Sequence, residues 1–81
     1  MTIPDSITEI GGAAFQANDL TSVTIPNTVT IIEAGAFQSN NLTSVVIPDS
    51  VETIGNRAFE YNPLTSLTLG NSVTTIGDDA I

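Results

Sequence analysis

The stretch Leu42-Thr-Ser-Val-Val-Ile-Pro-Asp-Ser-Val-Glu-Thr-Ile-Gly-Asn-Arg-Ala-Phe59 decides the fold, because the rest of the chain repeats it. The tetrapeptide Leu-Thr-Ser-(Val/Leu) begins at Leu20, Leu42 and Leu64, so the interval is 22 residues both times (42 − 20 = 22; 64 − 42 = 22). A fixed period of this size is typical of a solenoid, in which each unit buries its apolar face against its neighbours. The chain is thus predicted to be one array with units 1–19 (partial), 20–41, 42–63 and 64–81 (partial).

Each unit opens with apolar residues that alternate with Thr and Ser, as at Val23 and Ile25. This alternation predicts a short strand with one buried face. Strands one unit apart can pair in parallel, because the residues between them supply the crossover that a parallel pair needs. A proline column then ends the strand, since proline has no N–H to donate. The column consists of Pro4, Pro26 and Pro48, with Gly70 in the last unit.

The second half of each unit predicts two further elements. The apolar pair Val29 and Ile32, which recurs in every unit, predicts a shorter strand on the opposite wall of the coil. The Ala-Phe pair, which first occurs as Ala14-Phe15, predicts a tight helical or 3₁₀ turn that closes the coil on one side. The sequence therefore predicts a mainly-β repeat solenoid with a parallel sheet, short second strands and short helical turns.

An asparagine column precedes each long strand, at Asn18, Asn40 and Asn62. It could be a row of polar ligands. A buried ladder is favoured, because loop backbone inside a coil needs partners and asparagine supplies both donors and acceptors.

Nine acidic residues and one basic residue, Arg57, give a net charge of −8. This balance makes nucleic acid and anionic membranes poor partners. The acids are dispersed: Asp5 and Asp49 are separated in their column by Asn27, so no metal site is predicted. Arg57 lies one unit before Asp79, which predicts an ion pair between adjacent turns.

Catalytic residues are missing from the pattern. The chain has no histidine and no cysteine, so its serines and threonines lack the usual partner that activates a nucleophile. A carbohydrate-active enzyme would need two carboxylates about 5–10 Å apart in a cleft, and the repeat offers no such cluster. The prediction is a protein that is not an enzyme and uses no cofactor.

The start, Met1-Thr-Ile-Pro-Asp-Ser6, has neither the basic nor the apolar region of a signal peptide. No apolar run approaches the roughly 18 residues that would span a bilayer. Localisation is therefore not indicated by these residues, and membrane insertion is not expected.

The unit L-T-S-V-x-I-P-D/N-S/T-V-x-x-I-G-x-x-A-F resembles the BspA-type leucine-rich repeat, a family of mostly bacterial repeat proteins, over essentially the whole chain. The resemblance implies a curved, right-handed leucine-rich-repeat coil used for adhesion and for binding proteins or other ligands. It also implies a secreted or cell-surface location if the chain is a fragment of a longer array. One departure is the asparagine column, where the family commonly has cysteine.

The resemblance also implies that the outward side of the longer strands is the binding face. Its residues are mostly small hydroxyl side chains without the Trp, Tyr or Arg that dominate binding hot spots. They are Thr21, Ser22, Thr24, Thr43, Ser44, Val46, Thr65, Ser66 and Thr68. Ile31 is a separate candidate, since it stands where the other units have Glu9, Thr53 and Thr75; repeat drift is the alternative explanation.

Two functions remain open at this point. The first is an interaction or adhesion scaffold, as a segment of a longer array. The second is a self-associating structural unit, because both terminal turns lack a polar cap and would expose core residues and strand edges. On that basis the isolated chain is predicted not to be a stable monomer, with a two-fold dimer favoured.

Overall fold

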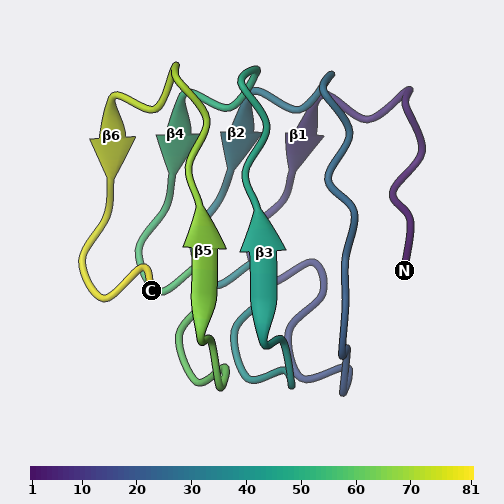
Figure 1. The fold of residues 1–81 in the computed structure, drawn as a ribbon, viewed down its shortest axis with the longest axis vertical. Coiled ribbons are helices and arrows are strands. Elements are labelled where there is room, and N and C mark those ends of the chain that lie inside the picture. The colour runs from purple at the N-terminus through teal and green to yellow at the C-terminus, as the bar shows by residue number, and fades with distance from the viewer.

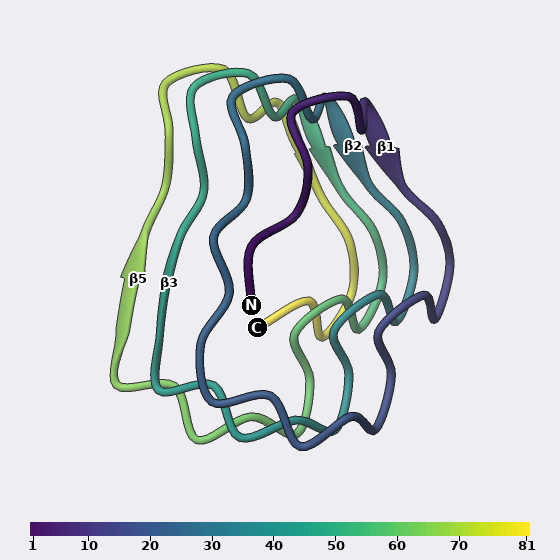
Figure 2. The same ribbon diagram turned by 90° about the vertical axis from the view of Figure 1, so that its right-hand side faces the viewer.

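The computed structural model describes residues 1–81 and shows a solenoid in which each repeat makes one turn of a coil (Figures 1 and 2). Two walls of short strands face each other across the core, and turns connect them at both ends. We call the wall that contains β3 (Ser44–Val46) and β5 (Ser66–Thr68) the front wall. The opposite wall, which contains β1, β2, β4 and β6, is the back wall.

The back wall is a continuous parallel sheet in the order β1-β2-β4-β6. Its strands are two residues each and lie one repeat apart: β1 (Glu9–Ile10), β2 (Ile31–Ile32), β4 (Thr53–Ile54) and β6 (Thr75–Ile76). Ile10 pairs with Ile32, and Ile32 pairs with Ile54 in turn. The predicted second strand is therefore confirmed, and it joins all four units.

The front wall is less regular than the repeated sequence suggests. β3 and β5 pair in parallel with Val45 opposite Leu67, whereas the first two units share only the single bridge between Thr2 and Thr24. The predicted long strand thus forms as a strand in the third and fourth units alone. The remainder of the front wall is made by residues 1–3 and 22–25, in extended backbone.

The Ala-Phe segment forms consecutive hydrogen-bonded turns, so the predicted helical or 3₁₀ turn is wrong. The N–H groups of Ala36 and Gln38 donate to the carbonyls of Glu33 and Gly35, three positions earlier, but Gly35 itself has a left-handed φ of 66°. A left-handed residue interrupts a right-handed helix. The turn opens because alternate N–H groups donate to the next unit: that of Phe37, for example, reaches the carbonyl of Ala58 at 2.8 Å.

Phenylalanine side chains of successive turns stack on one another in the core. Phe37 is fully buried, and its ring lies 5.4 Å from that of Phe15 and 5.3 Å from that of Phe59, nearly parallel to both. Such stacked pairs add roughly 0.5–1.5 kcal/mol each to the energy of apolar burial. Each core residue is therefore buried by its counterparts in neighbouring turns.

The asparagine column forms the predicted ladder. Asn40 is 5% exposed, and its side-chain amide donates to the carbonyls of Phe15 and Phe37, both at 2.9 Å. Its Oδ1 accepts from the N–H groups of Asn18 and Leu20. One turn later, the amide of Asn62 donates to the carbonyls of Phe37 and Phe59, and its Oδ1 accepts from the N–H of Leu42. The predicted ladder is therefore confirmed at Asn40 and Asn62, whereas Asn18 is exposed and its side chain bonds only to the carbonyl of Gln16 in its own turn.

Candidate functional site

The front wall presents hydroxyl side chains to solvent in rows. All nine residues predicted for the binding face are exposed, while Val45 between Ser44 and Val46 is buried in the core. This inside-outside alternation follows from the two-residue period of a strand. The structure therefore gathers these candidates on one surface.

Val46 is the apolar exception on this surface. Its side chain is 63% exposed, and Thr24 and Thr68 occupy the same column in the flanking turns. An isolated exposed valine is ordinary on a protein surface. It gains significance here from the break in the wall beside it.

The front wall is split between the second and third turns, and we call this split the seam. Residues 22–25 bond to residues 1–3, and residues 43–47 bond to β5 and its flanks. No backbone hydrogen bond joins residues 21–26 to residues 43–47. The front halves of these two turns therefore lie next to each other without forming a sheet.

The seam is a groove of about 290 Å³. It is lined by Ser22, Val23, Thr24, Ile25, Ser44 and Val46, none of which carries a charge. Val23 and Ile25 belong to the inward-facing columns, and Ile25 is buried. The groove thus reaches from the hydroxyl-rich surface to the side of the core.

The seam is confined to the front wall. Elsewhere the second and third turns are fully joined, as where the N–H groups of Gly35, Phe37 and Ser39 donate to the carbonyls of Asn56, Ala58 and Glu60. On the back wall, β2 and β4 pair in register. The two turns therefore separate on one side only.

Ile31 lies on the back wall, away from the front-wall candidates. It is half-buried on β2, beside Thr53 of β4, and lines a shallow depression of about 320 Å³. The structure therefore does not bring Ile31 together with the other candidate residues.

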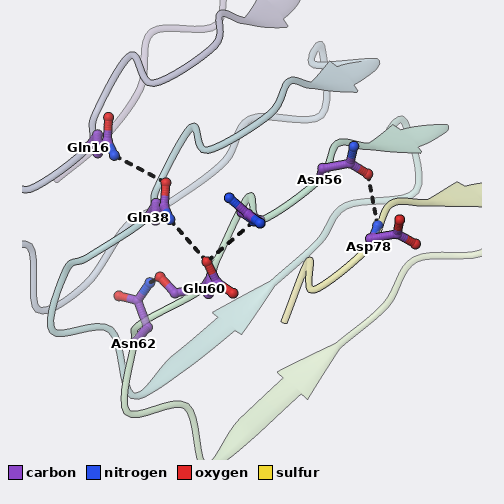
Figure 3. A network of polar contacts seen from close by, with 7 residues as sticks. Gln16, Gln38, Asn56, Glu60, Asn62 and Asp78 are labelled. Carbon is purple, nitrogen blue, oxygen red and sulfur yellow. Dashed lines mark hydrogen bonds and ion pairs between the residues drawn. The ribbon is translucent and has the colours of Figure 1, made fainter.

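A row of polar side chains crosses the turns, as Figure 3 shows. The Nε2 of Gln16 donates to Oε1 of Gln38 (3.1 Å), and the Nε2 of Gln38 donates to Oε1 of Glu60 (3.0 Å). The row was not predicted, although its members share the 22-residue spacing of the repeat (38 − 16 = 22; 60 − 38 = 22).

Arg57 joins this row within its own turn. Its Nε lies 3.8 Å from Oε1 of Glu60, so the predicted ion pair with Asp79 is wrong. Glu60 lies three residues after Arg57 on the same turn. The Nε2 of Gln38, in the preceding turn, donates to Glu60 and holds it in place. Asp79 lines the same open cavity of about 440 Å³ as Arg57 without pairing with it.

Two other features bear on chemistry. No group of three or more His, Cys, Asp or Glu side chains is close enough to hold a metal ion. No helix of a length and hydrophobicity that could cross a membrane is present. The surface features that stand out are thus the hydroxyl rows and the seam.

Comparison with protein families gives one match. The model described as "BspA type Leucine rich repeat region (6 copies)" matches residues 1–81. Searches of curated proteins and of solved structures find no match to the chain. Since the match covers every residue, and the observed coil has the parallel walls that the repeat predicts, the chain belongs to the family of BspA-type leucine-rich repeat proteins.

Proposed function

We propose that the chain is a non-enzymatic scaffold that binds a protein partner through its front wall. The observation that carries the proposal is the segregation on that wall: nine candidate residues in three consecutive units are exposed, while Val45 and Ile47 behind them are buried. Rows of hydroxyl groups offer adaptable donors and acceptors. Membership of the BspA-type family supports the same role, because leucine-rich repeats form scaffolds that commonly mediate protein interaction.

Adhesion at a cell surface or outside the cell is the setting we propose for this binding. The support is membership of the BspA-type family together with a net charge of −8, which disfavours nucleic acids and anionic membranes as partners. A protein surface or another cell-surface ligand fits this charge better.

The test is a selection of binders from a random-peptide phage library on the immobilised chain, followed by binding to two variants. The front-wall variant carries Thr24→Lys, Val46→Lys and Thr68→Lys. The control carries Thr8→Lys, Thr30→Lys and Thr74→Lys, all exposed in the column that flanks the back wall. Both variants gain the same charge, so general electrostatics cannot separate them.

We expect the selected peptides to lose binding to the front-wall variant and to keep it with the control, at unchanged circular dichroism of both. Equal binding to the two variants would remove the front wall from the proposal. Neutralising the acids, for example Asp49→Asn, should leave the affinity unchanged.

A second candidate is self-association, which a different observation favours. Leu69, Ile76 and Ile81 are 43%, 47% and 55% exposed and belong to the same last turn, where β5 and β6 each have one unpaired edge. A second copy would cover this surface. Light scattering over a concentration series should show dimers of the 81-residue chain, and a folded monomer at micromolar concentration would exclude this candidate.

A further inference from the structure

The backbone groups along the seam follow a strict order. In a parallel ladder, alternate residues of a strand bond to the same neighbour. Ile47 donates to Thr68, and Thr43 accepts from Ser66, so the odd-numbered residues of this segment bond to β5. The N–H and C=O groups of Ser44 and Val46 therefore face the seam.

The opposite side of the seam has the complementary order. Thr24 accepts from Ile3 and donates to Met1, so its backbone is used by the first turn. Val23 and Ile25 alternate with Thr24, and their N–H groups make no hydrogen bond within the chain. Two strand-like edges with unused donors and acceptors thus face each other across one groove.

We propose that the seam accepts an extended peptide segment of a partner protein, which adds a parallel strand between residues 22–25 and β3. This inference rests on the proposed function and specifies how the front wall would bind. Main-chain hydrogen bonds supply affinity in strand addition, and pockets for alternate side chains supply specificity. The seam provides both kinds of contact.

The lining defines the chemistry of the inserted segment. The groove contains only hydroxyl and aliphatic side chains, and a charged peptide side chain would find no partner in it. A segment with alternating aliphatic and small hydroxyl residues places its aliphatic side chains beside Val23 and Ile25. A volume of about 290 Å³ is near the lower limit of ligand pockets, which suits a short segment.

A single extended chain fits better than a folded surface. The unused groups lie inside the wall, between two backbones that the back wall holds together through β2 and β4. A folded partner could contact the rim of the groove but could not present backbone donors to both edges. The pairing of β2 with β4 and the hydrogen bond from the N–H of Asn41 to the carbonyl of Leu20 limit how far the seam can open.

The probe is a fluorescein-labelled peptide Leu-Thr-Ser-Val-Thr-Ile-Pro, the sequence of residues 20–26, because its alternation matches the flanking strands. Its binding is measured by anisotropy, and amide exchange of the ¹⁵N-labelled full chain is followed by NMR. We expect the N–H groups of Val23, Ile25, Ser44 and Val46 to gain protection. A peptide with proline in place of its central valine should bind at least about tenfold more weakly, because it lacks a central donor.

A disulfide across the seam supplies the matched control. The chain has no cysteine, so Thr24→Cys with Val46→Cys can form one bond, which would hold the seam closed after oxidation by oxidised glutathione. The control pair, Val46→Cys with Thr68→Cys, links residues that already pair in β3 and β5. Oxidation of the first pair should weaken peptide binding at least about tenfold, and oxidation of the second should not.

Three results would overturn the proposal: no binding of the peptide, binding without protection of the seam amides, or equal binding to both oxidised variants. If the cysteines at positions 24 and 46 do not form a disulfide, the seam stays open. The protection of the seam amides by the peptide is then the measurement that tests the proposal. Library-selected peptides could lose binding to the front-wall variant and yet bind the oxidised Thr24→Cys/Val46→Cys variant normally. In that case the proposed function stands and strand addition is excluded.

Discussion

A Cβ atom on Gly55 would lie 2.5 Å from the backbone nitrogen of Ala34 in the preceding turn. Gly77 is equally close to Asn56, whereas a Cβ on Gly11 would meet nothing within 4 Å. Gly11, Gly55 and Gly77 occupy the same column of the 22-residue repeat. The absence of a side chain therefore permits close contact between turns at Gly55 and Gly77, whereas Gly11 makes no such contact.

Gly55→Ala should destabilise the chain by about 1–3 kcal/mol, since the added methyl group forces two backbones apart. Gly11→Ala is the matched control and should change the unfolding free energy by less than about 0.5 kcal/mol. Urea titration followed by circular dichroism measures both. Equal losses would mean that the turns are not in contact at this column.

The Phe stack should dominate stability. Phe37→Ala removes a fully buried ring that contacts Phe15 and Phe59, and it should cost roughly 3–5 kcal/mol, enough to unfold so small an array. Thr24→Ala, on the exposed side of the front wall, should be near neutral because the Thr24 hydroxyl makes no hydrogen bond. Thermal unfolding of the two variants compares them, and similar melting temperatures would contradict the assigned interior.

Each asparagine of the ladder should stabilise the folded chain in proportion to the burial of its side chain. Asn40→Ala leaves the N–H of Leu20 and the carbonyl of Phe15 without their partner, and we expect a loss of about 2–4 kcal/mol. Asn18→Ala removes one exposed bond, to the carbonyl of Gln16, and should cost less than about 0.5 kcal/mol. A reversed order in denaturant titration would show that the ladder does not stabilise the coil.

Left-handed residues recur in the Ala-Phe turn, and one of their positions is occupied by such a residue in all four units. Ala13, Arg57 and Asp79 have φ values of 56°, 58° and 54°, and Gly35 has this conformation in the second unit. An L-residue pays about 1–2 kcal/mol for a left-handed backbone. Ala13→Gly should therefore be neutral or stabilising by up to about 1 kcal/mol, whereas Ala14→Gly should destabilise by about 0.5–1 kcal/mol.

Calorimetry of the two glycine variants gives the comparison, because the same methyl group is removed from adjacent exposed positions. Destabilisation by Ala13→Gly equal to that by Ala14→Gly would contradict the left-handed conformation of the turn.

Most of the coil follows from the columns of the repeat. The alternation at Val45 and Val46 predicted which side faces the core, and the Asn40 column predicted the ladder, because both depend on the same local pattern in every turn. The helical turn was wrong, since the pattern around Ala36 does not reveal that the N–H of Phe37 bonds to the next unit instead of its own.

The seam was not predictable from the repeat. Residues 20–25 and 42–47 have nearly the same sequence, so the pattern predicts equal pairing of all front strands. Whether two such strands form hydrogen bonds depends on the distance between neighbouring turns on each side of the coil. That distance is a property of the assembled turns and not of the sequence of one unit. The prediction that Arg57 pairs with Asp79 was wrong for a related reason. Glu60, which is positioned by Gln38, lies closer to Arg57 than Asp79 does.

Amide hydrogen exchange of the free chain, measured residue by residue by NMR, tests the central claim that the front wall is divided at one seam. The account predicts slow exchange at Thr24 and Ile47, whose N–H groups donate to Met1 and Thr68. It predicts exchange at least about tenfold faster at the unbonded N–H groups of the seam, those of Val23, Ile25, Ser44 and Val46. Slow exchange at all of these residues would show a continuous front sheet and would contradict the account.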